Sequence, residues 1–344
     1  MLQSLDFEKP LDELEAQIDE LKNLAASDGM SPADHAKILE RIERIEKHKI
    51  ELMGKIFGQL SPYQEVKMAR HLKRPYSLDY IAQICDDWVE LHGDRAFGDD
   101  GAVVAGLGRF RGRSVAIVGN QKGRDVKERQ ARNWGQPSPE GLRKAGRVMG
   151  MAARFGRPII SLVDTPGAAC SPAAEERGIS EAIAHSQMLM SRLQVPIIVV
   201  IIGEGCSGGA IATALGDRVL MLEHAYYSVI SPEACASILF RDPAKAPQTS
   251  DQLKITARDA LRLGVIEEIV PEPLGGAHRD LRRMSATLGD AIEKHLSELE
   301  RFSGEELVEN RYQRFRKLGD LEDPAALVEA GVEPVFEPEL NGTH

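Results

Sequence analysis

The residues best suited to chemistry form a glycine-rich segment, Gly203-Glu204-Gly205-Cys206-Ser207-Gly208-Gly209-Ala210. An apolar run at 196–202 precedes this segment and a helical pattern follows it, so we expect it to turn from a strand into a helix. Residues 205–209 match the G-x-S-x-G pattern of a nucleophile elbow, in which Ser207 would attack an acyl group. That chemistry also needs an acid and a histidine, and the chain offers Asp217, Asp242, His224 and His278.

A second interpretation of the same turn needs no attacking side chain. The first N–H groups of a helix have no partner within the helix and carry partial positive charge. Glycine at positions 208 and 209 would let a ligand approach the backbone closely. The turn would then be an oxyanion hole for an enolate or urea oxygen. Spacing alone slightly favours the elbow, and a tight turn whose glycines serve packing only is a third possibility.

Another glycine-bearing turn, Asp164-Thr165-Pro166-Gly167-Ala168, follows the apolar run at 158–163. Asp-Thr-Pro-Gly resembles the magnesium-side motif of GTPases, but no phosphate-binding G-x-x-x-x-G-K-[ST] precedes it, which excludes that function. The turn lies at the carboxyl end of a strand, the usual ligand-facing edge of an α/β sheet. The next acidic pair, Glu175 and Glu176, fits either a solvated helix start or a general base.

The elements that position these turns alternate between strand and helix, which predicts an α/β fold with a buried sheet. We expect a helical arm at 1–75, because apolar residues recur every three or four positions, and a main domain at 76–300. A final helix and a loose acidic tail occupy 301–344. The expected strands are 102–110, 114–119, 158–163, 196–202, 217–222 and 265–270. The expected helices of the main domain and its C-terminal extension are 77–91, 138–156, 179–193, 210–215, 233–240, 252–263, 278–299 and 304–318.

Composition narrows the class of protein. Of 344 residues, 42% are hydrophobic and 28% charged, and the net charge is −10, which is typical of a globular chain and argues against a nucleic-acid binder. Basic residues still concentrate at 109–154, a stretch that contains twelve Lys or Arg and only three acidic residues. No two of the four cysteines form a CxxC pair, so no metal site is expected. The N-terminus does not resemble a signal peptide and no apolar run is long enough to cross a bilayer, so we expect a cytoplasmic protein.

Beyond these features, the chain resembles the carboxyltransferase α subunit of bacterial-type, multisubunit acetyl-CoA carboxylase. Matching stretches run in order and at family spacing from about residue 5 to 318. They include Gly93-Asp94-Arg95, Gln121-Lys122-Gly123-Arg124, Pro139-Glu140-Gly141, Asp164-Thr165-Pro166-Gly167-Ala168, Glu175-Glu176-Arg177-Gly178, Gly203-Glu204-Gly205, Ser207-Gly208-Gly209-Ala210, Tyr227-Ser228-Val229-Ile230-Ser231-Pro232-Glu233, Lys245-Ala246-Pro247, Pro271-Glu272-Pro273-Leu274-Gly275-Gly276-Ala277-His278-Arg279 and Arg311-Tyr312-Gln313-Arg314.

The resemblance implies a crotonase-superfamily fold of ββα units, with the N-terminal arm and C-terminal helices added. It implies a carboxyltransferase that moves the carboxyl group from carboxybiotin, held on a biotin carboxyl carrier protein, to acetyl-CoA. The product is malonyl-CoA for fatty-acid synthesis. The implied partners are a β subunit in an α2β2 heterotetramer, the carrier protein and, in the wider complex, biotin carboxylase; no membrane or nucleic acid is implied. Biotin and acetyl-CoA or malonyl-CoA are the implied ligands, and zinc belongs to the β subunit.

The resemblance also assigns roles in the site. Gly208 and Gly209 would supply helix-start donors, and Gly167, Ala168 and Ala169 would form the facing loop. Residues expected to contact biotin are Thr165, Gly205, Cys206 and Ser207. The basic stretch at 109–154 would guide CoA phosphates or the acidic carrier.

Two departures from the family pattern affect these loops. Ala169-Cys170-Ser171 stands where Tyr-Pro-Gly is usual, and Cys206 stands where glycine is usual. These changes place a cysteine in each of the two facing loops, and Cys170 and Cys206 could form a redox-sensitive pair or only fill space. Cys85 and Cys235 are expected in the core.

Three alternatives to the carboxyltransferase remain open. A stand-alone crotonase-type acyl-CoA enzyme would share the fold and work without a β subunit. A serine hydrolase would use Ser207 and react with a fluorophosphonate. A non-enzymatic subunit would bind a partner and contribute no catalytic group of its own.

Overall fold

The computed structural model describes residues 4–27 and 31–319. The acidic tail expected after the last helix lies outside these described residues. None of the helices in the described ranges is long and apolar enough to cross a membrane.

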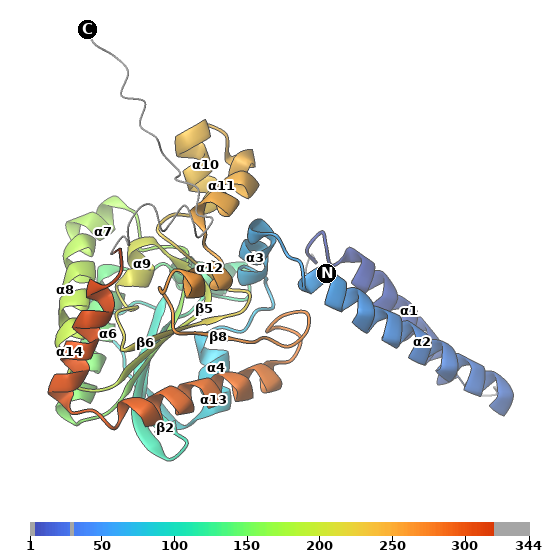
Figure 1. The fold of residues 1–344 in the computed structure, drawn as a ribbon, viewed down its shortest axis with the longest axis horizontal. Helices are drawn as coiled ribbons and strands as arrows, with labels where there is room; N and C mark the ends of the chain where they lie inside the picture. The colour runs from blue at the N-terminus through green and yellow to red at the C-terminus, as the bar shows by residue number, and fades with distance from the viewer. Residues whose placement is uncertain (1–3, 28–30, 320–344) are drawn as a thin grey trace, which may run out of the picture.

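The chain begins with a helical arm that projects from the body (Figure 1). Helix α1 (Lys9–Ala25) packs against the longer α2 (Pro32–Phe57). The side chain of Ser31 accepts a hydrogen bond from the Asp34 backbone and caps α2, an interaction that typically contributes about 1 kcal/mol. After α2, the short helix α3 (Pro62–Ala69) reaches the body, where Val66 is fully buried. Helices therefore occupy the described part of the stretch expected as an arm, but α3 packs into the core of the body.

The body is built on an eight-stranded sheet in the order β1-β2-β3-β4-β5-β6-β8, with β7 paired to β5 beyond the end of β6. Strands β2 and β3 form the expected antiparallel hairpin, and β3 to β6 and β8 run parallel. Every residue of β4 and β5 is buried, as expected for central strands covered on both faces. The bounds are β1 Cys85–Glu90, β2 Val103–Phe110, β3 Arg113–Asn120, β4 Ile159–Thr165, β5 Ile197–Cys206, β6 Arg218–Leu222, β7 Tyr226–Ser228 and β8 Glu268–Val270.

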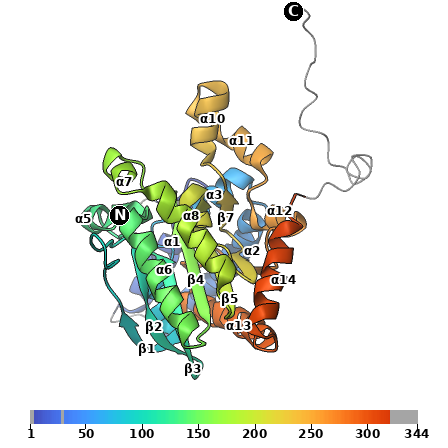
Figure 2. The same ribbon diagram turned by 90° about the vertical axis from the view of Figure 1, so that its left-hand side faces the viewer.

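Helices cover this sheet and leave the carboxyl ends of its parallel strands beneath a group of short helices (Figures 1 and 2). Helix α6 packs on β2 and β3 and also on α8, while α13 packs on β5, β8 and α4. The remaining bounds are α4 Ser77–Ile84, α5 Val126–Ala131, α6 Pro139–Arg154, α7 Pro172–Glu176, α8 Ile179–Arg192, α9 Ser207–Ile211, α10 Pro232–Phe240, α11 Ala246–Leu253, α12 Ala257–Arg262, α13 Leu281–Leu299 and α14 Gly304–Arg316, with 3-10 turns η1 Asn133–Gly135 and η2 Pro243–Lys245.

Several expected element boundaries were wrong. The helix expected at 77–91 ends at Ile84, because the following residues pair with β2 as the edge strand β1. The helix expected at 252–263 is two helices, since Lys254 adopts φ 51° and separates α11 from α12. The helix expected at 210–215 begins three residues earlier, at Ser207, and ends at Ile211. Neither β7 nor α5 was anticipated.

Candidate active site

The two glycine-bearing turns meet at the carboxyl ends of the neighbouring strands β4 and β5. A Cβ atom at position 209 would lie 2.6 Å from the carbonyl carbon of Gly167 and 2.7 Å from the nitrogen of Ala168. Only glycine at position 209 permits this backbone contact. Gly167 itself adopts φ 144°, a conformation that favours glycine. The glycines at positions 167 and 209 therefore allow the backbones of the two turns to come into contact.

Three backbone N–H groups around this contact are free. Gly208 and Gly209 lie in the first turn of α9, and among the described residues no acceptor pairs with their N–H groups or with that of Ala168. The other two expected donors are already engaged. Gly167 donates to the Thr165 hydroxyl at 3.1 Å, and Ala169 donates to the Pro137 carbonyl at 2.9 Å. Of the three residues expected to donate from the facing loop, only Ala168 has an N–H without an acceptor among the described residues.

Of the four residues expected to contact biotin, two line a cavity and two are buried behind the turns. Cys206 and Ser207 line a cavity at the turn. Thr165 is fully buried, and its hydroxyl donates back to the Gly167 carbonyl at 2.8 Å, which closes the turn. Gly205 lies within the sheet, paired with Thr165 on β4 and with Tyr227 on β7. Thr165 and Gly205 therefore support the turns from behind.

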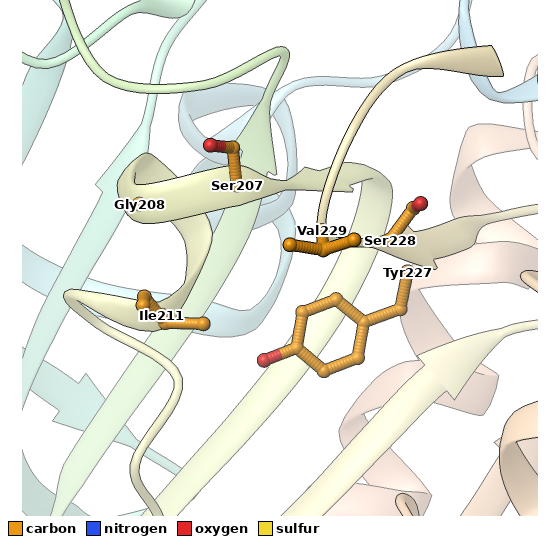
Figure 3. A pocket seen from close by; sticks show the side chains of 6 residues that line it. All are labelled: Ser207, Gly208, Ile211, Tyr227, Ser228 and Val229. Carbon is orange, nitrogen blue, oxygen red and sulfur yellow. The ribbon is translucent and has the colours of Figure 1, made fainter. Parts of the chain in front are cut away.

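Two cavities share Ser207 and Gly208 in their walls. One, of about 270 Å³, is lined by Ser207, Gly208, Ile211, Tyr227, Ser228 and Val229. Figure 3 shows the Tyr227 ring and Ile211 facing this opening, with the Ser207 side chain pointing away from it. The other, of about 420 Å³, lies between the two turns and includes Gly167, Ala168, Cys170, Ser207 and Gly208 in its wall. A ligand in either cavity would reach the start of α9.

Ser207 has the backbone of a nucleophile elbow but not its partners. Its φ is 55°, the left-handed conformation typical of such a serine. However, His224 is hydrogen-bonded to Glu65 at 2.7 Å, and the His278 ring stacks on His71.

The two acids considered for a triad are also engaged elsewhere. Asp217 lies at the opposite end of the parallel strands and binds Arg311 at 2.8 Å, while Asp242 caps the turn η2. The side chains considered for a catalytic triad are therefore dispersed.

A buried ion-pair network supports both turns from below. The Lys122 ammonium, from the segment after β3, lies 2.6 Å from Asp164 Oδ1 and 2.8 Å from Glu204 Oε1. Arg70 and the Tyr226 hydroxyl each contact the other oxygen of Glu204 at 2.7 Å. Arg70 also binds Glu233 at the start of α10 at 2.7 Å. The network thus links the ends of β4 and β5 to α3, β7 and α10.

The charges in this network stabilise one another. Burial alone would raise the pKa of Glu204, but Lys122 and Arg70 lower it to about 2. Burial alone would lower the pKa of Lys122, but Asp164 and Glu204 hold it above its usual range. Burial raises the pKa of Asp164 despite the neighbouring ammonium. In the sequence analysis, Lys122 appears only within a family stretch and within the basic stretch at 109–154, with no role beneath the two turns. A lysine in the segment after a buried strand was a usable signal.

Most of the basic stretch is engaged in contacts within the chain. Arg124 binds Asp79 and the Arg74 carbonyl, Arg129 binds the Gly123 carbonyl, and Arg132 binds the Gly101 carbonyl. Arg111, Arg113 and Lys144 form ion pairs with Asp290, Glu293 and Asp99. The ion pairs among these contacts offset the positive charge of Arg111, Arg113, Arg124 and Lys144.

The cysteines in the two turns have different environments. Cys170 is exposed, whereas Cys206 is buried, and burial raises the pKa of its thiol to about 11. Both line the larger cavity and both are free thiols. Cys235 is buried as expected, but Cys85 is only partly buried because it lies on an edge strand.

Within residues 4–27 and 31–319, one group of side chains lies close enough to share a cation. Ligand atoms of Glu8, His71 and His278 lie within 4.8 Å of one another where the arm meets the body. The Glu8 carboxylate, however, already accepts the Leu5 N–H at 3.1 Å and lies 3.4 Å from the Arg279 guanidinium. We interpret this cluster as a polar contact that docks the arm.

Chains of known structure define the class to which this fold belongs. Transcarboxylase 12S, with methylmalonyl-coenzyme A and methylmalonic acid bound, matches with a TM-score of 0.53 and 24% identity over 70% of this chain and 46% of that chain. A Pseudomonas malonate decarboxylase hetero-tetramer in complex with coenzyme A matches with a TM-score of 0.50 and 18% identity over 69% of this chain and 92% of that chain. This chain spans about half the length of the transcarboxylase chain. The fold is the crotonase-type fold of carboxyltransferases, as expected.

Sequence comparison identifies the family within this class. The family described as acetyl co-enzyme A carboxylase carboxyltransferase-like matches residues 4–319. The acetyl-coenzyme A carboxylase carboxyl transferase subunit alpha of Geobacter metallireducens is 53% identical over 314 residues, covering 91% of this chain and 96% of the relative. The corresponding subunit of Thermus thermophilus is 50% identical over 321 residues, covering 93% and 99%. The chain belongs to the family of acetyl-CoA carboxylase carboxyltransferase α subunits, which are transferases, and the resemblance seen in the sequence motifs is confirmed.

Proposed function

We propose that this chain, together with a β subunit, transfers the carboxyl group from carboxybiotin on a biotin carrier protein to acetyl-CoA. The product is malonyl-CoA for fatty-acid synthesis. The observation that carries the proposal is the contact between the two turns, next to which the N–H groups of Ala168, Gly208 and Gly209 have no acceptor among the described residues. Such fixed donors suit a reaction in which negative charge develops on an oxygen.

The chain's own contribution is electrostatic. Carboxybiotin supplies the carboxyl group and, once that group has left, a basic ureido nitrogen. The N–H groups at the start of α9 stabilise an oxyanion on the ureido or thioester oxygen, and each such donor is worth roughly 3 kcal/mol. The reaction needs no side-chain nucleophile, which agrees with the dispersal of Asp217, His224 and His278.

Exposed apolar side chains beside the site support the need for a partner. Val229 is 77% exposed and lies in the cavity wall, while Ile238 and Leu239 on α10 are 71% and 63% exposed. Exposed apolar side chains on adjoining segments are typical of a surface that a partner covers. We assign this surface to the β subunit, and the carrier protein would deliver biotin beneath it. Biotin carboxylase would act earlier, loading the carrier.

The test is carboxylation of free biocytin with malonyl-CoA as the donor, measured for the chain alone and for the chain mixed with its β subunit. Activity in the mixture alone is the expected result. Activity of the chain alone would indicate a complete site and a stand-alone crotonase-type enzyme. No activity in either sample, with the β subunit shown to be bound, would contradict the proposed reaction.

The rival hydrolase function has one observation in its favour, the elbow-like φ of Ser207. A fluorophosphonate probe separates the two functions, because it labels an activated serine. We expect no labelling of Ser207, since no histidine reaches its hydroxyl among the described side chains.

A further inference from the structure

Lys122 lies beneath the two turns, between the ends of β4 and β5. Its side chain is 12% exposed, and its ammonium contacts Asp164 on β4 and Glu204 on β5. Asp164 immediately precedes the Thr165–Ala168 turn, and Glu204 lies three residues before Ser207. One ammonium therefore bridges the last residues before each turn.

The same bridge aligns the backbone. Asp164 Oδ1 accepts the Glu204 N–H at 2.9 Å as well as the lysine contact. Between Val163 and Thr165 the pairing of β4 with β5 shifts register, so the regular sheet no longer fixes the spacing of the strands there. The ion pairs of Lys122 therefore connect β4 and β5 at the point where the regular backbone pairing of these strands is interrupted.

We propose that Lys122 is a positioning residue for the carboxyl transfer. It holds the ends of β4 and β5 at the separation that keeps the backbone of Gly167 and Ala168 in contact with Gly209. This inference rests on the proposed function and deepens it, because it adds a residue that touches no substrate yet sets the geometry of the donors.

An uncharged side chain at position 122 should not support this geometry, because Asp164 and Glu204 would lose the positive charge that lies between them. Without the ammonium, two carboxylates that approach the same point would repel each other in a buried environment. Either the strand ends separate or one carboxylate takes up a proton. Arg70 cannot substitute, because it contacts the opposite oxygen of Glu204 and extends toward Glu233.

The test compares Lys122→Met with the matched control Lys144→Met in the biocytin assay with the β subunit. Lys144 is also buried, with a side chain 1% exposed and a 2.5 Å contact to Asp99, but it lies on α6. We expect Lys122→Met to lower kcat by about 100-fold, since misplacement of catalytic groups by an ångström has that effect, with little change in KM. Equal losses of kcat in the two variants would overturn the proposal.

A double variant separates positioning from stability. Lys122→Met/Asp164→Asn removes the uncompensated carboxylate and should recover the melting temperature lost in Lys122→Met. The proposal predicts that kcat stays low in this variant, because the bridge between the strand ends is still missing. Recovery of kcat together with stability would show that Lys122 has only a structural role.

Amide hydrogen exchange provides a readout that needs no activity. The Ala169 N–H is bonded to the Pro137 carbonyl and should exchange slowly in the wild-type chain. Faster exchange at Ala169 in Lys122→Met, but not in Lys144→Met, is expected. Unchanged exchange would refute the proposal even if the wild-type protein catalysed another reaction, so the two proposals fail separately.

Discussion

Individual residues show what the glycine-rich segment does. Ser207 has the position and the backbone of a nucleophile, and the spacing of its neighbours favoured that interpretation slightly. The structure separates it from the histidines and acids that would activate it. Backbone groups, not side chains, are the chemistry that the segment presents.

A substitution at Ser207 tests that conclusion. Ser207→Ala should retain most of the biocytin carboxylation activity, because the variant keeps the N–H groups at the start of α9. The positive φ of 55° is costly for alanine, so Ser207→Gly is the matched variant free of that strain. Loss of activity in both variants would assign the hydroxyl a direct role.

Residues also mark the limit of prediction from sequence. The two glycine turns were found because glycine after an apolar run is a strong local signal. Lys122 was missed as a functional residue because its partners, Asp164 and Glu204, are 42 and 82 positions away. Contacts across such separations depend on the order of strands in the sheet, which periodicity does not determine.

The sequence predicted helices and strands well where an element has one apolar face or is buried on both faces. The hairpin β2–β3 and the buried strands β4 and β5 were found from their apolar runs. The edge strand β1 was not, since the exposed residues Asp86 and Asp87 interrupt any alternation and Asp87 adopts φ 53°. A strand at the edge of a sheet is identified by its neighbour, and sequence periodicity does not specify that neighbour.

The docking of the arm should depend on pH. Burial lowers the pKa of His278. The imidazoles of His278 and His71, 3.6 and 3.5 Å from the Glu8 carboxylate, hold the pKa of Glu8 below its usual range although burial opposes this. In the undocked state, His278 on the body and Glu8 on the arm therefore take up protons near their ordinary pKa values of 6.5 and 4.5, at a higher pH than in the docked state. Acidification through those values should destabilise docking, since the undocked state binds more protons.

Limited proteolysis of the segment between α2 and α3, measured from about pH 7.5 to 5, checks this prediction. Cleavage should accelerate as the pH falls through the ordinary range of histidine. His278→Gln should lose that response, whereas His35→Gln, at an exposed position on α2, should keep it. An identical pH response in His278→Gln would contradict the account.

At the scale of the whole molecule, the site lies on an exposed end of the body. Residues of α7, α8, α9 and α10 border its cavities. At this end of the body, α10 and α11 project above the other helices (Figures 1 and 2). We expect Ile238→Asp/Leu239→Asp to weaken association with the β subunit, because a charge opposes burial of an apolar surface. Phe155→Asp is the control, at a side chain 70% exposed that follows α6 and precedes β4, at the other end of the strands.

Sedimentation of each variant mixed with the β subunit measures this association. The α10 variant should sediment mainly as separate subunits under conditions in which the Phe155 variant forms the complex. Normal complex formation by the α10 variant would place the β subunit on another surface.

The most direct test of the central claim is the kcat for biocytin carboxylation of Gly209→Ala compared with Gly208→Ala, each mixed with the β subunit. A Cβ at position 209 would meet the Gly167 backbone at 2.6 Å, whereas one at 208 would meet only the mobile end of Ile183 at 2.9 Å. If contact between the turns forms the site, Gly209→Ala should lose about 100-fold or more in kcat and Gly208→Ala much less. Equal activity of Gly209→Ala and the wild-type chain would show that catalysis does not depend on that contact.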